Sequence, residues 1–244
     1  MEDKELFALF CECFPDTQKE ALLILDFAER FGRIHKRYIE GELACMVCTA
    51  PISDFGLEAE YIFACGVKPK HRGKGLFKKT LCEVIGEGCA MLIPEREELY
   101  SMYERLGFAP IYCIEAFFGG DGSGFRDCGR DELKKAYEAA AIYPKISENM
   151  LDYTANAFLS YGGSIVTDGN AAVFMQDGRA TEILASDEQR MLAAAAKCKS
   201  AYLPCGLAQT LDEMGTEYKK IKLAAAKNLP DRKAESIYIN NLFN

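Results

Sequence analysis

The stretch from Tyr61 to Lys79, YIFACGVKPKHRGKGLFKK, constrains the fold of this chain more than any other part of the sequence. It begins with a run in which the side chains on both faces of an expected strand are apolar, which is typical of a central strand buried on two faces. Pro69 then ends the strand, because proline has no N–H to donate to a neighbouring strand. Gly73 and Gly75 follow in a basic loop, and beyond them apolar residues recur at helical spacing. The sequence therefore predicts a strand, a tight loop and the start of a helix in series.

That junction has the properties of an anion-binding site. Unpaired backbone N–H groups and the positive end of a helix dipole meet there. From Lys68 to Lys79 there are six Lys or Arg residues, one histidine and no acid, although the whole chain has a formal net charge of −8. The nucleotide loop GxxxxGK[ST] does not fit, because Gly75 follows Lys74 where a hydroxyl residue is needed, and no GxGxxG leads into a βαβ unit. We therefore expect an anion site that does not hydrolyse nucleotides.

The loop resembles the acetyl-CoA loop of the GNAT acyltransferases, V-x4-[RQ]-x-x-G-x-[GA]. Val67, Arg72 and Gly75 match that pattern, and Phe77 replaces the usual small residue at its last position. A second stretch, SMYERLGF at Ser101–Phe108, resembles the same family's [FL]YxxxGF signature at about the expected distance downstream. Because the two motifs occur in the family's order, the chain is identified as similar to GNAT N-acetyltransferases.

The resemblance implies acetyl-CoA as co-substrate and assigns provisional roles to residues. Tyr103 is the expected acid that protonates the departing thiolate. For the base, the sequence itself offers Glu60 as a candidate, and the resemblance adds the terminal carboxylate of Asn244, with Glu58, Glu97, Glu98 and water as open alternatives. The expected cofactor contacts are Cys65, Gly66 and Val67 for the pantetheine and acetyl group, Arg72, Gly73, Lys74, Gly75, Leu76, Phe77 and Lys78 for the pyrophosphate, and Glu98 and Leu99 at the start of the next helix.

These roles agree with the chemistry of acyl transfer. Attack of an amine on a thioester builds negative charge on the carbonyl oxygen, which a fixed backbone N–H near Val67 would stabilise. A tyrosine, with a pKa near 10, can protonate a thiolate whose parent pKa is roughly 8.5 when transfer is coupled to bond breaking. Most of the rate would come from positioning the two reactants.

Composition narrows the class of protein. The chain has 244 residues, 49% of them hydrophobic, which is enough for one large or two small cores. There is no apolar run of about 18 residues, and MEDKELF is too acidic for a signal peptide, so we expect a cytoplasmic protein without a membrane partner. Of eleven cysteines, only Cys45 and Cys48 form a CxxC pair, which predicts reduced buried thiols and no metal site. A single basic loop in a chain with a pI of about 5.0 predicts no nucleic-acid partner.

The apolar pattern predicts an α/β (α+β) fold, in which a GNAT-like mixed sheet with flanking helices precedes a second, degenerate GNAT-like domain. Two helices are expected between residues 4 and 31, then a hairpin of strands Arg33–Ile39 and Glu42–Thr49 that turns at Glu40-Gly41, the central strand, and further helices and strands to Phe118. The expected domains are 1–118 and 131–244, joined by a glycine-rich linker at 119–130. The order of elements then repeats, but acids replace the lysines and glycines of the loop. This arrangement resembles two-domain bacterial acetyltransferases of the enhanced-intracellular-survival class without their third domain.

The sequence leads to one leading hypothesis and two alternatives. The first is an acetyl-CoA-dependent N-acetyltransferase that acts on a small-molecule or peptide amine by direct transfer, without a metal. The second is a catalytically silent acyl-CoA-binding or regulatory module. The third is a structural interaction protein in which the basic loop is idle. The identity of the amine, the base and homo-oligomer formation stay open.

Overall fold

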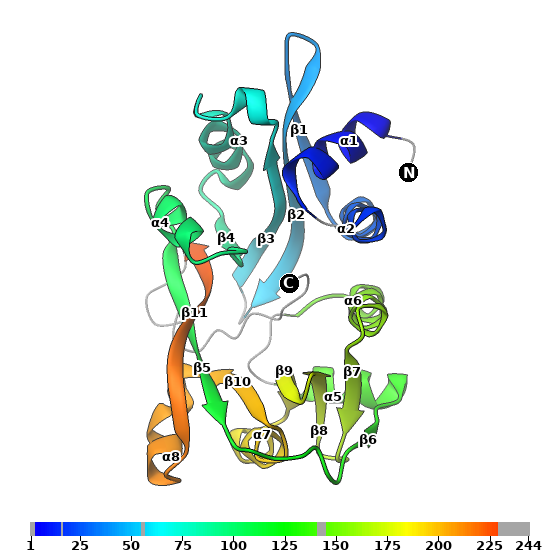
Figure 1. Ribbon diagram of the computed structural model, residues 1–244, viewed down its shortest axis with the longest axis vertical. Helices are drawn as coiled ribbons and strands as arrows, with labels where there is room; N and C mark the ends of the chain where they lie inside the picture. The colour runs from blue at the N-terminus through cyan, green and yellow to red at the C-terminus, as the bar shows by residue number, and fades with distance from the viewer. Residues whose placement is uncertain (1–2, 16, 55–56, 141–144, 229–244) are drawn as a thin grey trace. The chain divides into compact units, whose positions relative to one another are not determined.

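The computed structural model describes residues 3–15, 17–54, 57–140 and 145–228 (Figure 1). The described chain divides into two compact units. Unit 1 holds residues 3–109 together with residues 225–228, and unit 2 holds residues 110–224. The chain therefore leaves unit 1, builds unit 2 and returns to unit 1 at its described end.

Two helices open unit 1, as the sequence predicts. The first is α1 (Lys4–Cys13), where Asp3 accepts a hydrogen bond from the N–H of Leu6. The second is α2 (Gln18–Phe31), which begins with a capping box between Thr17 and Glu20. Their apolar faces pack against the sheet in a cluster that includes Leu6, Phe10, Ala21, Leu25, Leu43 and Met46.

The sheet of unit 1 begins with an antiparallel meander of β1 (Arg33–Ile39), β2 (Glu42–Asp54) and β3 (Leu57–Val67). Glu40 and Gly41 form the first hairpin with positive φ values of 50° and 83°. The fourth strand, β4 (Cys89–Leu92), runs parallel to β3. Residues 225–227 then pair antiparallel with the other edge of β4.

Helices cover both faces of this sheet (Figure 1). The helices α1 and α2 lie on one face, whereas α3 (Leu76–Ile85) and α4 (Glu98–Glu104) lie on the other. A one-turn 3-10 helix, η1 (Pro69–His71), connects β3 to the loop that precedes α3. The core under α3 and α4 contains Val47, Ile62, Leu81, Ile85, Leu92, Tyr100, Tyr103 and Phe108.

Unit 2 repeats the order of helices, a three-strand meander, a helix and a parallel strand. Its sheet has the order β11-β5-β10-β9-β8-β7-β6, in which β9 and β10 are parallel and the β6–β7, β7–β8, β8–β9 and β5–β10 pairs are antiparallel. The strands are β5 (Ala109–Phe117), β6 (Arg126–Asp127), β7 (Ser164–Thr167), β8 (Ala171–Gln176), β9 (Arg179–Ala185), β10 (Ser200–Pro204) and β11 (Glu217–Lys227). The helices are α5 (Arg130–Ala139), α6 (Glu148–Ser160), α7 (Glu188–Ala195), η2 (Cys205–Leu207) and α8 (Ala208–Glu213).

The boundary between the units differs from the expected domains 1–118 and 131–244. The glycine-rich segment 119–130 is fixed within unit 2 rather than free, because the N–H groups of Gly119, Gly120 and Gly122 donate to the carbonyls of residues 199, 198 and 197. Arg126–Asp127 then forms β6 against β7. Turn-forming residues predicted a linker here, but long-range hydrogen bonds hold the segment in place.

Candidate functional site

The loop between β3 and α3 has the backbone conformation that its glycines predict. Gly73 and Gly75 have φ values of 75° and 70°, and Gly75 is the N-cap of α3. A Cβ atom at either position would meet nothing within 4 Å. Backbone conformation, and not crowding, is therefore the reason that glycine suits these two positions.

A run of backbone N–H groups at this loop has no acceptor. Among the described residues, no N–H from Gly73 to Lys78 donates a hydrogen bond to another protein group. The first paired group is the N–H of Lys79, which donates to the carbonyl of Gly75 at 3.0 Å. Arg72, both glycines, Lys74 and Lys78 are exposed. Consecutive unpaired N–H groups at a helix N-terminus form an anion-binding concavity.

The basic side chains of the loop divide into two sets. Arg72 donates from Nε to the carbonyl of Val67 at 2.9 Å, which fastens the end of β3 to the loop. Lys68, Lys70 and His71 contact one carboxylate, that of Glu42. Within the described chain, Lys74, Lys78 and Lys79 form no ion pair. Sequence reasoning took the whole loop as unopposed positive charge and missed Glu42, which lies 26 residues before Lys68 and has no local signal.

The strand β4 ends before β3 reaches this loop. Their parallel register runs from Ala59 opposite Cys89 to Ile62 opposite Leu92, and β3 continues to Val67 without β4 beside it. The expected contacts Cys65, Gly66 and Val67 all lie on that continuation. Gly66 has a packing reason as well, because a Cβ atom there would lie 2.9 Å from Sγ of Cys13.

A β-bulge interrupts β3 at the same level. The register with β2 shifts between Met46 and Cys48, and Ala64 has a φ of 45°, an unfavourable value for a residue with a Cβ atom. Such a bulge turns backbone groups away from the regular ladder. Sequence reasoning did not identify Ala64, and the apolar run around it carries no signal for a left-handed residue.

Tyr103 lies in the apolar core under α3 and α4 and is 7% exposed. Its ring meets Phe77 and Phe108 edge-on, with centroids 6.1 Å and 5.6 Å away. Burial, and to a smaller extent the nearby thiol of Cys65, raises the pKa of the Tyr103 phenol well above its ordinary value. The group therefore stays protonated and is a donor. Phe77 turns its ring into this core, so that a large residue fits at the last motif position.

The structure brings some of the expected residues together and leaves others apart. Cys65, Phe77, Leu99 and Tyr103 join one apolar cluster, whereas Glu98 is exposed in the first turn of α4.

Glu60 pairs across the sheet with Pro51 and Ala90. By strand alternation it shares a face with Ile62 of that cluster. Burial lowers the pKa of His35, and the charge of Glu60 opposes that effect, which places the two side chains near each other. Asn244 lies outside the described residues.

The corresponding place in unit 2 has different chemistry. The strand β9 leads through Ser186 and Asp187 into α7, and the Asp187 carboxylate accepts a hydrogen bond from the N–H of Arg190 at 2.9 Å. This carboxylate occupies the helix N-terminus and repels an anion. The loop of unit 1 therefore has no equivalent at this position.

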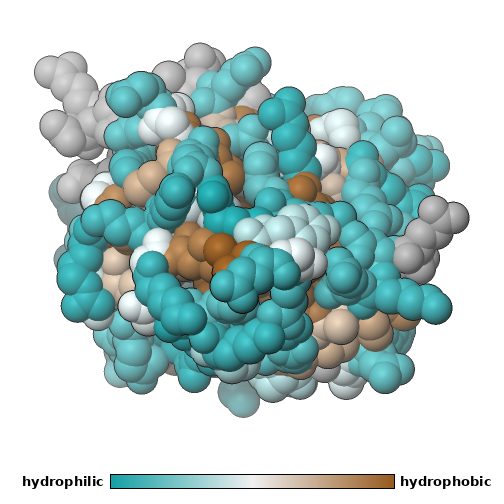
Figure 2. All heavy atoms as spheres, turned by 90° about the horizontal axis from the view of Figure 1, so that it is seen from above, coloured by the Kyte–Doolittle hydropathy of each residue, from teal (hydrophilic) through white to brown (hydrophobic). Residues whose placement is uncertain are grey.

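The described part of the chain contains neither a metal-binding cluster nor a membrane-spanning helix. In residues 3–15, 17–54, 57–140 and 145–228, no three His, Cys, Asp or Glu side chains gather as a metal-binding group. No helix in those ranges is long and apolar enough to cross a membrane. Figure 2 shows the end of the molecule at the top of Figure 1, where apolar groups lie within a rim of hydrophilic residues.

Solved structures share the fold at low sequence identity. A GCN5-related N-acetyltransferase from Kribbella flavida is 16% identical, with a TM-score of 0.65, and the match covers 94% of this chain and 70% of that one. Eis1 from Mycobacterium abscessus is 16% identical, with a TM-score of 0.63 and coverages of 96% and 72%. A GCN5-related N-acetyltransferase from Anabaena variabilis is 12% identical, with a TM-score of 0.61 and coverages of 91% and 69%.

No protein-family model matches the sequence, and no curated protein sequence matches it significantly. The structural likeness, together with the strand order and the helices on both faces of the sheet, confirms the expected mixed-sheet architecture with a second GNAT-like repeat. The chain therefore has the fold of the two-repeat GNAT N-acetyltransferases.

Proposed function

We propose that this chain is an acyl-CoA-dependent N-acyltransferase that moves an acetyl group from acetyl-CoA to the amine of a small molecule or peptide. One observation carries the proposal: the unpaired N–H groups at the start of α3 follow, after one short turn, the part of β3 that continues beyond the end of β4. An anion site and an open strand edge are thus adjacent. A pyrophosphate and an extended amide-containing arm need those two features in that order.

The proposed contacts follow from the chemistry of each group. The N–H groups from Gly73 to Lys78 would hold the pyrophosphate, and the exposed ammonium groups of Lys74 and Lys78 would add attraction. The pantetheine arm would lie along Cys65–Val67 like an added strand. The bulge at Ala64 would direct a backbone N–H toward the thioester carbonyl oxygen, where negative charge develops during attack.

Tyr103 is the proposed proton donor to the leaving thiolate. Its phenol stays protonated through neutral pH because burial raises its pKa. Ionisation of Tyr103 should therefore cause no loss of rate up to about pH 10, the ordinary tyrosine pKa. Glu60 and water remain the proposed proton acceptors for the amine.

Calorimetric titration with acetyl-CoA tests the site. We expect the wild type to bind with a Kd between about 1 μM and 1 mM, the range usual for enzyme substrates. The double variant Arg72→Glu with Gly75→Asp should bind at least about 100-fold more weakly, because two acids would face the phosphates. A matched control is Arg30→Glu with Gly206→Asp, because both positions are exposed and lie outside the loop, and a Cβ atom at Gly206 would meet nothing within 4 Å. Absence of wild-type binding would reject the acyltransferase proposal.

A second candidate, a silent acyl-CoA-binding module, is favoured by the enclosure of Tyr103 between two aromatic rings. Tyr103→Phe separates the candidates, since it deletes one hydroxyl and keeps the ring contacts. For a transferase the rate of amine acetylation should fall by about 10² to 10⁴, with the Kd of acetyl-CoA unchanged. An unchanged rate would show that the tyrosine only packs. Binding without product across an amine screen would support the silent module.

A further inference from the structure

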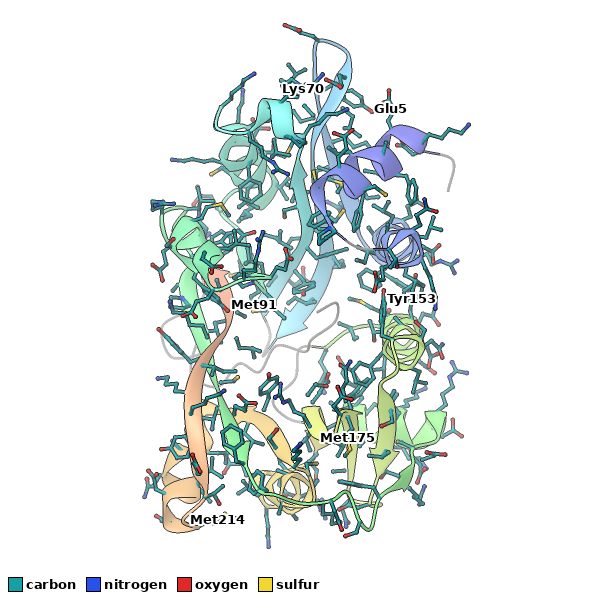
Figure 3. The ribbon with its side chains drawn as sticks, in the orientation of Figure 1. Glu5, Lys70, Met91, Tyr153, Met175 and Met214 are labelled. Atoms are coloured by element: carbon teal, nitrogen blue, oxygen red, sulfur yellow. The ribbon has the colours of Figure 1, made fainter. Side chains whose placement is uncertain are left out.

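One carboxylate contacts three basic groups of the anion loop. Glu42 begins β2, directly after the first hairpin, and its Oε1 accepts a hydrogen bond from Nζ of Lys68 at 2.7 Å. Its Oε2 lies 2.5 Å from Nζ of Lys70 and 3.2 Å from Nε2 of His71. Lys70 is labelled in Figure 3, beside the hairpin that precedes β2. An acid from a neighbouring strand thus engages every basic residue of the 3-10 turn.

These contacts keep Glu42 ionised. Hydrogen bonds from Lys68, Lys70 and His71 lower the pKa of the Glu42 carboxyl to about 2. Lys68 has a second acidic neighbour, Glu12, at 3.4 Å. The positive charge at the start of the loop is therefore largely cancelled within unit 1. The unopposed charge is confined to the segment that follows the turn, where the unpaired N–H groups lie.

The same contacts fix the backbone of the turn. The N–H of Lys68 donates to the carbonyl of Ala44 on β2 at 2.9 Å, and the N–H of His71 donates to the carbonyl of Lys68 at 2.8 Å. The N–H of Arg72 donates to Pro69 at 3.2 Å. Glu42 adds side-chain bonds at both ends of this short turn. Because the unpaired N–H groups begin at Gly73, the turn decides where they point.

We propose that Glu42 is a positioning residue for the phosphate loop: its carboxylate joins Lys68, Lys70 and His71 into one turn and, together with that of Glu12, offsets the charge of the two lysines. The loop then selects a compact phosphate group through the oriented N–H groups after the turn. Without Glu42 it would become a looser segment that attracts polyanions generally. This inference rests on the proposed function for the identity of the anion, a CoA pyrophosphate.

Hydrogen exchange tests the positioning without any ligand. In Glu42→Gln a neutral amide with one acceptor oxygen replaces a carboxylate that engages three donors. We expect the amides of His71 and Arg72 to exchange at least about tenfold faster than in the wild type, because local opening becomes easier. Glu83→Gln is the matched control, since Glu83 pairs with Arg37 outside the loop. Equal exchange in the wild type and both variants would overturn the proposal.

Titration with CoA at about 0.05 M and 0.5 M KCl tests the effect on charge, because salt screens unpaired surface charges strongly over that range. We expect Glu42→Gln to bind at least about fivefold more weakly at the higher salt, where preorganised N–H groups supply most of the affinity. Its Kd should also change more steeply with salt than that of the wild type or Glu83→Gln. Equal or tighter binding at 0.5 M would overturn the inference. If the wild type binds no CoA, the proposed function fails. Faster amide exchange in Glu42→Gln would still show that Glu42 holds the turn in place.

Discussion

Glu182 is a carboxylic acid buried without a partner. It is 1% exposed on β9, opposite Phe174 of β8, and within the described chain neither of its oxygens has a hydrogen-bond partner. Burial raises the pKa of Glu182 well above its ordinary value of 4.5. Burial is the main reason that the pKa of Tyr137 of α5 is raised, and the charge of Glu182 adds to this effect, which places the two side chains near each other. In the folded chain this acid is therefore held neutral under the helix.

A raised pKa in the folded state makes stability depend on pH. The stabilisation that the protonated acid gives is fully present below the unfolded pKa of about 4.5 and is lost as the pH rises through the folded pKa. We expect Glu182→Leu to unfold at a temperature higher by about 4 °C or more at pH 8, because an unsatisfied buried polar group costs about 1–3 kcal/mol. The difference should shrink at pH 5.

Thermal unfolding at the two pH values is the measurement. Glu188→Leu is the matched control, since Glu188 is exposed in the first turn of α7 in the same unit. If Glu182→Leu follows the wild type at both pH values, the buried acid has no effect on the pH dependence of stability.

Single residues also show what the sequence can and cannot predict about the candidate site. Gly75 at the start of a helix follows from local backbone rules, and the structure places it there with positive φ. Ala64 and Glu42 do not follow from such rules. The conformation of Ala64 depends on the register between two strands, and the contacts of Glu42 depend on a hairpin that returns it to the loop. Both are consequences of tertiary pairing.

At the level of secondary structure, the start of α3 depends on one left-handed residue. Gly75 has a φ of 70° as N-cap, and a Cβ atom there has open space. We expect Gly75→Ala to lower the free energy of unfolding by about 1–2 kcal/mol, because a left-handed backbone is unfavourable by that amount for a residue with a Cβ atom. The same substitution should weaken binding of acetyl-CoA. Gly75→Asn should cost less, because asparagine tolerates this conformation. The measurements are thermal unfolding and calorimetric titration, and equal effects of Ala and Asn would show that conformation is not the cause.

Most helices and strands follow from periodicity, and the exceptions have identifiable causes. Sequence reasoning ended the second strand at Thr49, before Pro51, whereas β2 continues to Asp54. The continuation is tolerated because β1 pairs with β2 only as far as Thr49, so that the missing N–H of Pro51 breaks no bond on that side.

The strand β11 was not predicted at all. Its run of alanines, Ala224–Ala226, favours a helix, and pairing with β4 overrides that preference.

At the level of the whole molecule, the described chain does not divide into two consecutive segments. Residues 225–228 belong to unit 1, where they pair with β4. We expect a fragment of residues 1–118 to lose cooperative unfolding or to unfold at least about 10 °C below the full chain, because one edge of β4 would have no partner. Fusing residues 217–228 to this fragment through a flexible linker should restore a cooperative transition, and circular dichroism on heating is the measurement. A cooperative 1–118 fragment as stable as the fused form would contradict this expectation.

The returning strand also affects how the protein is made. A ribosome synthesises the loop at residues 68–79 long before residues 225–227, so the sheet that carries this loop cannot be completed while the nascent chain is still short. Until then one edge of β4 has unpaired backbone N–H and C=O groups, which can pair with strands of other chains. Folding of unit 1 would therefore finish only after residues 225–227 have left the ribosome, and products terminated before residue 225 would lack the strand that closes β4. We expect such products to be prone to aggregation and to depend on chaperones.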